Sequence, residues 1–161
     1  MIFIGSSQHS VDAKNRLAIP AKFRSRIDPE RDGNGFVVIC GQPSDRLWLY
    51  PERYFEALAS RARSRLIPDG DQLRFDQLYF PSAEPAELDS QGRILIPERM
   101  LHAAGLGREV VICGVRDHLE IRRPEDWEKE SKEAGALWVQ YQDKAREAYE
   151  DVRRQPGPEA G

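Results

Sequence analysis

The 161-residue chain has few of the residues from which disulfide frameworks and metal sites are built. It holds two cysteines and three histidines, and neither cysteine has a ligand-spaced neighbour of either type. Cys40 and Cys113 are therefore expected to be small buried hydrophobic residues, and no metal site is expected. No run of about 18 apolar residues could span a membrane, and the N-terminus lacks a basic region followed by an apolar one. We thus expect a cytoplasmic chain without a membrane partner.

Motifs of catalysis and nucleotide binding are absent as well. His9, His102 and His118 occur in unrelated contexts, without a nucleophile-elbow sequence, and His102 is most simply a helix-terminal residue. The chain has no glycine-rich phosphate loop of the P-loop or Rossmann type. We therefore expect no enzymatic activity, no cofactor and no small-molecule substrate.

The formal net charge of -3 argues against indiscriminate binding to nucleic acid, but the charges are unevenly distributed. Residues 1–27 carry five basic side chains against one acidic side chain, whereas residues 124–161 carry ten acidic against six basic ones. A local basic surface is therefore expected within the N-terminal part of the chain, and a different role for the C-terminal part.

What the sequence does contain is an internal duplication. Three segments recur in the same order: 12–20 (DAKNRLAIP) with 89–97 (DSQGRILIP), 37–41 with 110–114 (both VVICG), and 47–51 with 119–124. Such a repeat indicates one structural unit used twice. A unit of roughly 45 residues is too small to support a core alone, so we expect both copies to share one core.

Each copy is predicted to form a strand, a short helix, two strands and a helix. The first strand follows the Asp-Arg segment, and Pro20 or Pro97 then occupies the first turn of a helix, where its missing N–H would be unpaired anyway. These helices are expected at 20–27 and 97–104, with Gly105 ending the second. They are too short for regular crossovers, so a β-rich α+β fold is favoured over parallel winding.

Two further segments lie outside the repeats. A short helix is expected at 71–80, and residues 81–85 break it and lead into the second copy. Its apolar side chains are expected to anchor it to the core: Leu73, Phe75, Leu78 and Tyr79. Near the C-terminus, apolar residues recur every seven positions, which predicts a helix docked within the subunit or between subunits. The residues of this seam are Trp127, Ala134, Tyr141 and Ala148, with Trp138, Ala145 and Val152.

The predicted organisation has five parts. They are a first repeat at 6–53, a helical linker at 54–85, a second repeat at 86–127, a C-terminal helix at 128–154 and a disordered tail at 155–161.

The Asp-Arg segment is expected to form the same turn in both copies. Asn15 and Gly92, directly before each arginine, are the residue types that tolerate a positive φ most easily. The aspartate and the arginine are expected to pair and brace the turn: Asp12 with Arg16, and Asp89 with Arg93. Such a pair also orients the guanidinium group toward a phosphate or a guanine edge.

A paired-carboxylate site, as in aspartic proteases, is a weaker alternative for Asp12 and Asp89. Lys14 and the two arginines would keep both carboxylates ionised, which is unsuitable for sharing one proton.

Residues 12–24 and 89–101, with the two VVICG strands, resemble the MraZ family of transcriptional regulators. The resemblance covers about residues 1–150, and two D-x-x-x-R motifs at this separation are highly specific. It implies two SpoVT/AbrB-like halves in a pseudo-twofold swapped-hairpin β-barrel, with short peripheral helices and a C-terminal helix. It also implies a ring-shaped homo-oligomer, often an octamer, that binds direct repeats in double-stranded DNA near its own promoter. Such a protein would be nucleoid-associated and would repress its own operon in the division and cell-wall gene cluster.

The resemblance places DNA contact on the arginine of each motif, here Arg16 and Arg93. Lys14, Asn15 and Gln91 are candidate partners for phosphates or bases. Because one subunit presents few positive charges, affinity is expected to come from several subunits on successive DNA repeats. The first motif has asparagine where the family has glycine, and the second has no lysine, so we expect the first copy to bind phosphate more strongly.

The alternative is a non-enzymatic, antitoxin-like interaction module of the same fold, in which the barrel supports a toxin-binding tail. The fold alone does not separate the two functions. The short stretch after Val152 argues against a long toxin-wrapping segment.

Overall fold

The computed structural model describes residues 1–41, 43–61 and 69–154, so the predicted tail at 155–161 lies outside the described residues. The chain divides into two compact units, residues 1–124 and 125–161. The first unit contains eight strands and five helices: β1 (Phe3–Ser10), β2 (Arg16–Ala18), α1 (Ala21–Arg24), α2 (Pro29–Asp32), β3 (Gly35–Cys40), β4 (Leu47–Pro51), α3 (Glu52–Arg61), α4 (Gly70–Ser82), β5 (Glu84–Glu87), β6 (Arg93–Leu95), α5 (Glu98–Ala103), β7 (Glu109–Arg116) and β8 (His118–Arg122), counted over the described ranges. The helix α6 (Pro124–Arg154) begins at the last residue of the first unit and makes up the described part of the second unit.

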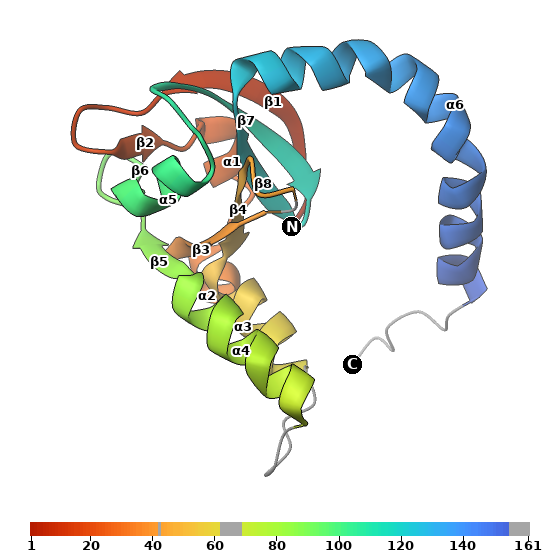
Figure 1. The fold of residues 1–161 in the computed structure, drawn as a ribbon, viewed down its shortest axis with the longest axis horizontal. Coiled ribbons are helices and arrows are strands. Elements are labelled where there is room, and N and C mark those ends of the chain that lie inside the picture. The colour runs from red at the N-terminus through yellow and green to blue at the C-terminus, as the bar shows by residue number, and fades with distance from the viewer. Residues whose placement is uncertain (42, 62–68, 155–161) are drawn as a thin grey trace. The chain divides into compact units, whose positions relative to one another are not determined.

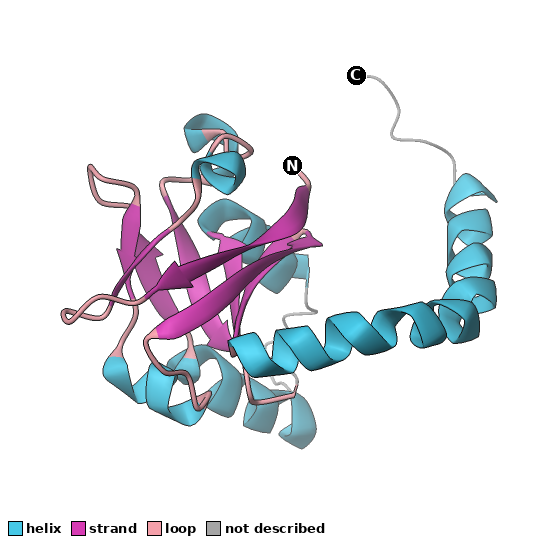
Figure 2. Cartoon of the chain, turned by 90° about the horizontal axis from the view of Figure 1, so that it is seen from above, coloured by secondary structure: helices cyan, strands magenta, loops and turns pink. Residues whose placement is uncertain are grey.

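The first unit is a mixed α+β fold with antiparallel strands (Figures 1 and 2). Six strands form one sheet in the order β1-β7-β8-β4-β3-β5, and β2 pairs with β6 in a separate two-stranded ribbon. We call β1 and β5, which precede the two Asp-Arg turns, the leading strands. The two copies are interleaved, because each leading strand pairs with the VVIC strand of the other copy: β1 with β7, and β5 with β3.

Equivalent positions of the two copies face each other at two places. Leu17 pairs with Ile94 at the middle of the ribbon, and Trp48 pairs with Glu120 where β4 meets β8. This is the register expected when a local twofold axis relates the two copies, because an antiparallel pair centred on such an axis must bring equivalent residues together.

The two copies share one core, as the size of the repeat predicts. Its fully buried side chains come from both halves and include Phe3, Leu17, Phe23, Leu49, Ile94, Met100, Ile112 and Ile121. Burying each such side chain contributes on the order of 1.5 to 3 kcal/mol, which makes the shared core the main source of stability. Cys113 belongs to the buried residues as predicted, while Cys40 is only partly buried.

The prolines stand at the starts of the short helices, but one residue before the predicted first-turn position. Pro20 and Pro97 are the N-cap residues of α1 and α5, and Gly105 follows α5 with a φ of 61°. The helix α1 is shorter than predicted and ends at Arg24. His102 lies in the last turn of α5, as predicted.

The leading strands β1 and β5 were not predicted. Residues 81–85 end the helix and lead into the second copy, as predicted, with Pro81 still in the last turn of α4 and Pro85 already in β5. Proline is tolerated there because β5 is the edge strand of the sheet and its outer side needs no N–H donor.

The predicted anchoring of residues 71–80 to the core is wrong. The helix α4 exists, but it has no buried residue, and Phe75 and Leu78 are 53% and 60% exposed. Its aromatic rings pack instead on α3, where the Phe55 ring lies 6.4 Å from the Tyr79 ring. The helix therefore adds a second, half-exposed layer outside the core.

The C-terminal helix begins at Pro124, earlier than the predicted 128, and runs to Arg154. Trp138 and Tyr141, two residues of the predicted seam, are exposed. The side chains of Ala148 and Val152 lie outside the described residues.

Candidate nucleic-acid interface

The first Asp-Arg turn is held by the carboxylate of Asp12. Its Oδ1 accepts hydrogen bonds from the backbone N–H groups of Lys14 and Arg16, both at 2.9 Å. Its Oδ2 accepts the Nε–H of Arg16 at 2.7 Å. Asn15 donates its N–H to the carbonyl of Asp12 at 3.0 Å and has the predicted positive φ, 59°.

The second turn repeats this geometry. Oδ1 of Asp89 accepts the N–H groups of Gln91 and Arg93, both at 2.9 Å, and Oδ2 accepts the Nε–H of Arg93 at 2.8 Å. Gly92 donates to the carbonyl of Asp89 at 2.9 Å and has a φ of 73°. The predicted common turn and its bracing pair are therefore confirmed in both copies.

The ribbon brings the two arginines onto one surface. Arg16 pairs with Leu95, and Ala18 pairs with Arg93, so these four side chains share one face of the ribbon while Leu17 and Ile94 fill the other. Leu95 is 60% exposed, which identifies this face as the outer one. The two arginines are two residues apart along the ribbon, or roughly 7 Å.

Each turn also contacts the chain that leads into the helix of the other copy. The carbonyl of Gly92 accepts the N–H of Ile19 at 3.0 Å, and the carbonyl of Asn15 accepts the N–H of Ile96 at 2.9 Å. The second turn therefore lies beside the start of α1, and the first turn beside the start of α5. Figure 1 shows the ribbon at the side of the first unit away from α4.

The bracing keeps both carboxyl groups ionised near neutral pH. Backbone and side-chain hydrogen bonds from Arg16 lower the pKa of Asp12, and the Arg93 guanidinium lowers the pKa of Asp89 to about 2. Each carboxylate is also occupied within its own turn. The geometry thus argues against a proton-sharing pair of aspartates.

The arginines remain accessible although they are braced. The side chains of Arg16 and Arg93 are 33% and 26% exposed, and Lys14 and Gln91 are exposed beside them. A guanidinium group has five N–H donors, so bracing by one carboxylate leaves others for a ligand. This surface can bind an acceptor-rich, anionic group such as a phosphate.

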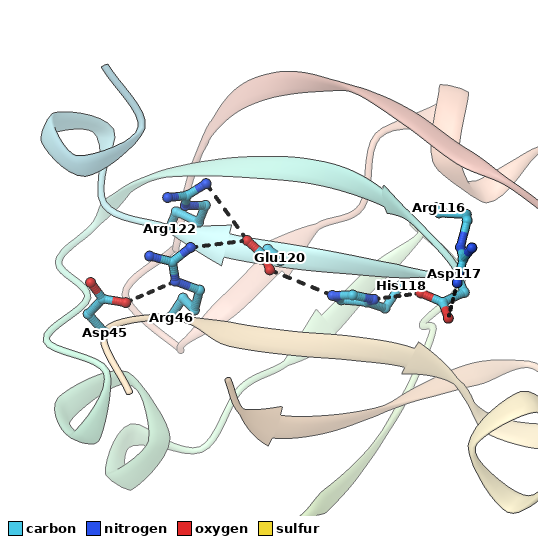
Figure 3. A network of polar contacts seen from close by, with 7 residues as sticks. All are labelled: Asp45, Arg46, Arg116, Asp117, His118, Glu120 and Arg122. Atoms are coloured by element: carbon cyan, nitrogen blue, oxygen red, sulfur yellow. Dashed lines mark hydrogen bonds and ion pairs between the residues drawn. The ribbon is translucent and has the colours of Figure 1, made fainter. Parts of the chain in front are cut away.

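A second polar cluster, which the sequence did not predict, lies near the centre of the sheet (Figure 3). Glu120 Oε2 lies 3.5 Å from Arg46 Nη1, Glu120 Oε1 lies 3.6 Å from His118 Nε2, and His118 Nδ1 lies 2.8 Å from Asp117 Oδ1. Burial lowers the pKa of His118, but its bonds with Glu120 and Asp117 outweigh burial and raise it. The sequence of β8 could have indicated this cluster, because His118, Glu120 and Arg122 alternate with the core residues Leu119 and Ile121 and so share the opposite face of the strand.

This cluster has the character of a structural network. The ring of His118 lies 5.0 Å from that of Trp48 and 4.9 Å from that of Tyr50, so it packs against two aromatic side chains of the neighbouring strand β4. Among the described residues, no group of three or more histidine, cysteine and carboxylate side chains could hold a metal ion.

Comparison with known proteins places these turns in a family. The model of the MraZ protein family, whose description includes the words "antitoxin-like", matches residues 2–75 and 79–137. The chain belongs to the MraZ family. The matched ranges contain both Asp-Arg turns and all the strands of the first unit that are described above.

Several MraZ relatives align over most of their length. A protein of Symbiobacterium thermophilum named "Transcriptional regulator MraZ" is 37% identical over 88% of this chain and 98% of its own. Proteins of the same name from Pelotomaculum thermopropionicum and Thermomicrobium roseum are 37% and 39% identical, over 94% and 78% of this chain and 92% and 84% of their own. None of the described helices of this MraZ family member is both long and apolar enough to cross a membrane.

Proposed function

We propose that this chain is a sequence-specific DNA-binding transcriptional regulator. The observation that carries the proposal is the outer face of the β2–β6 ribbon, which presents two carboxylate-braced arginines side by side. The relatives named transcriptional regulators support the same conclusion.

A two-stranded ribbon of this kind has the dimensions to enter the major groove of B-DNA. The planar guanidinium fork binds a phosphate or the O6 and N7 atoms of guanine with two hydrogen bonds. Arg16 and Arg93 are assigned these contacts. Lys14, Asn15 and Gln91 are assigned contacts with phosphates or bases at the two turns.

The finer proposal concerns assembly and target. One ribbon offers few positive charges, so useful affinity requires several subunits on successive DNA sites. We propose a ring-shaped homo-oligomer, such as an octamer, that binds promoter-proximal direct repeats, associates with the nucleoid and represses its own operon in the division and cell-wall cluster. In this proposal the exchanged leading strands form the swapped-hairpin barrel of the SpoVT/AbrB-like fold.

The test is a fluorescence-anisotropy titration with DNA from upstream of the chain's own gene, at several salt concentrations. Tight binding with a preference over scrambled DNA is expected, and a steep decrease of affinity with salt would count the phosphate contacts. Arg74→Ala, on the exposed face of α4, is the control variant and should bind normally. Equal affinity for promoter and scrambled DNA would overturn the proposal.

A second candidate is an antitoxin-like interaction module, which the wording of the family description favours. Absence of DNA binding by a folded, oligomeric protein would support it.

A further inference from the structure

The second turn is covered by an arginine from the first copy. Arg24, at the end of α1, donates its Nε–H to the carbonyl of Ile19 at 2.9 Å. A Cβ atom placed on Gly92 would lie 2.7 Å from both Nε and Cζ of Arg24, so the guanidinium group rests directly on the Gly92 backbone. Gly92 is consequently buried, although Ser90 and Gln91 on the same turn are exposed.

This cover exists in one copy only. The residue equivalent to Arg24 in the second copy is Leu101, which is 8% exposed and belongs to the core. The first turn has its own extra cation, Lys14, where the second turn has the neutral Gln91. Each turn thus has a basic side chain besides its motif arginine. At the first turn it is Lys14, from the turn itself, and at the second turn it is Arg24, from α1.

We propose that Arg24 is a DNA-contacting residue that completes the binding site at the second turn by binding a backbone phosphate. The inference rests on the proposed function, because it adds a contact to that site. The contact with Ile19 uses only Nε, and within the described ranges Arg24 forms no ion pair with a carboxylate. Its terminal nitrogens are therefore available at the second turn, next to Gly92 and one residue before Arg93 in the sequence, where a guanidinium group favours an anion.

A purely structural Arg24 would act differently. It would hold the Gly92 turn in shape, and its loss would lower stability and affinity together without changing the number of phosphate contacts. The salt dependence of binding separates the two roles, because each phosphate contact contributes about 0.9 to the slope of log affinity against log salt.

The experiment compares the full-length wild type with Arg24→Gln and Arg24→Lys on promoter DNA at several salt concentrations. Arg24→Gln should bind roughly tenfold more weakly and with a shallower slope, whereas Arg24→Lys should keep most of the slope because it keeps the charge. Arg74→Gln is the matched control and should change neither quantity. Melting temperatures of all variants establish that they are folded.

A double-mutant cycle locates the contact. Arg24→Gln should be non-additive with Arg93→Ala and additive with Arg16→Ala, because Arg24 lies at the second turn. If the wild type binds promoter DNA but Arg24→Gln keeps its affinity and slope, the Arg24 inference fails and the proposed function stands. If the wild type binds no DNA preferentially, the proposed function fails and the inference fails with it.

Discussion

The two Asp-Arg turns have the same internal hydrogen bonds but different surroundings. In both, one carboxylate oxygen accepts two backbone N–H groups at 2.9 Å and the other accepts the arginine Nε–H. Around them, Lys14 corresponds to Gln91, and Leu101 to Arg24. The difference teaches that the aspartate and a positive φ determine the shape of the turn, while the charge around it can be supplied from elsewhere in the fold.

The centre of the sheet shows the same kind of divergence. Trp48 and Glu120 occupy equivalent positions and face each other across β4 and β8. Two facing glutamates would repel each other, whereas a tryptophan opposite a carboxylate leaves the charge free to pair with Arg46 and His118. A duplicated chain with facing equivalents can thus become asymmetric without losing its register.

The largest expected effect is on DNA affinity. Arg16→Ala and Arg93→Ala should each weaken binding to promoter DNA by roughly 5- to 150-fold, the range for a lost bidentate contact of about 1 to 3 kcal/mol. The turn sequences alone predict a larger loss of affinity for Arg16→Ala, in the first copy. Because Arg24 adds a positive charge at the second turn, we expect the two losses of affinity to agree within about threefold. Anisotropy titration at one salt concentration measures both. Normal binding by either variant would mean that only one turn contacts DNA.

A smaller effect is expected from exchanging the two residues of positive φ. Asn15→Gly and Gly92→Asn should each change the free energy of unfolding by less than about 1 kcal/mol, since both types tolerate the conformation. Gly92→Asn should still weaken DNA binding, because its side chain displaces Arg24. Urea unfolding and anisotropy titration measure the two quantities. Unchanged DNA affinity of Gly92→Asn would mean that Arg24 does not contribute to DNA binding.

The smallest effect is on the titration of the bracing carboxylates. The pKa of Asp89 is lowered to about 2, so its bracing is fully present above the ordinary aspartate pKa of 3.8 and is lost as the pH falls through about 2. Carboxyl NMR shifts against pH should show this value, and Arg93→Ala should raise it toward 3.8 while Arg16→Ala leaves it unchanged. A wild-type pKa near 3.8 would contradict the bracing geometry.

Local features of this fold could be predicted from the sequence. The positive φ of Asn15 and Gly92, the Asp-Arg pairs and the proline-initiated helices each depend on a few neighbouring residues. The leading strands could not be predicted, because β1 (FIGSSQHS) has no regular apolar alternation and is ordered by pairing with β7.

Contacts between residues that are far apart in the sequence could not be predicted either. The repeated motif aligns the two turns, but the cover of Gly92 by Arg24 does not follow from it, because the interleaving of the copies brings these residues together. Similarly, apolar residues at helical spacing in α4 indicated a packed face but not its partner, which is α3 and not the core.

The most direct test of the central claim is arginine footprinting on promoter DNA. The protein is treated with an arginine-selective dicarbonyl reagent with and without saturating DNA, and modified sites are quantified by mass spectrometry. Arg16, Arg24 and Arg93 should become protected by DNA, while Arg31 on α2 and Arg74 on α4 keep their reactivity. Unchanged modification of Arg16 and Arg93 at saturation would contradict the assignment of the ribbon as the DNA-binding surface.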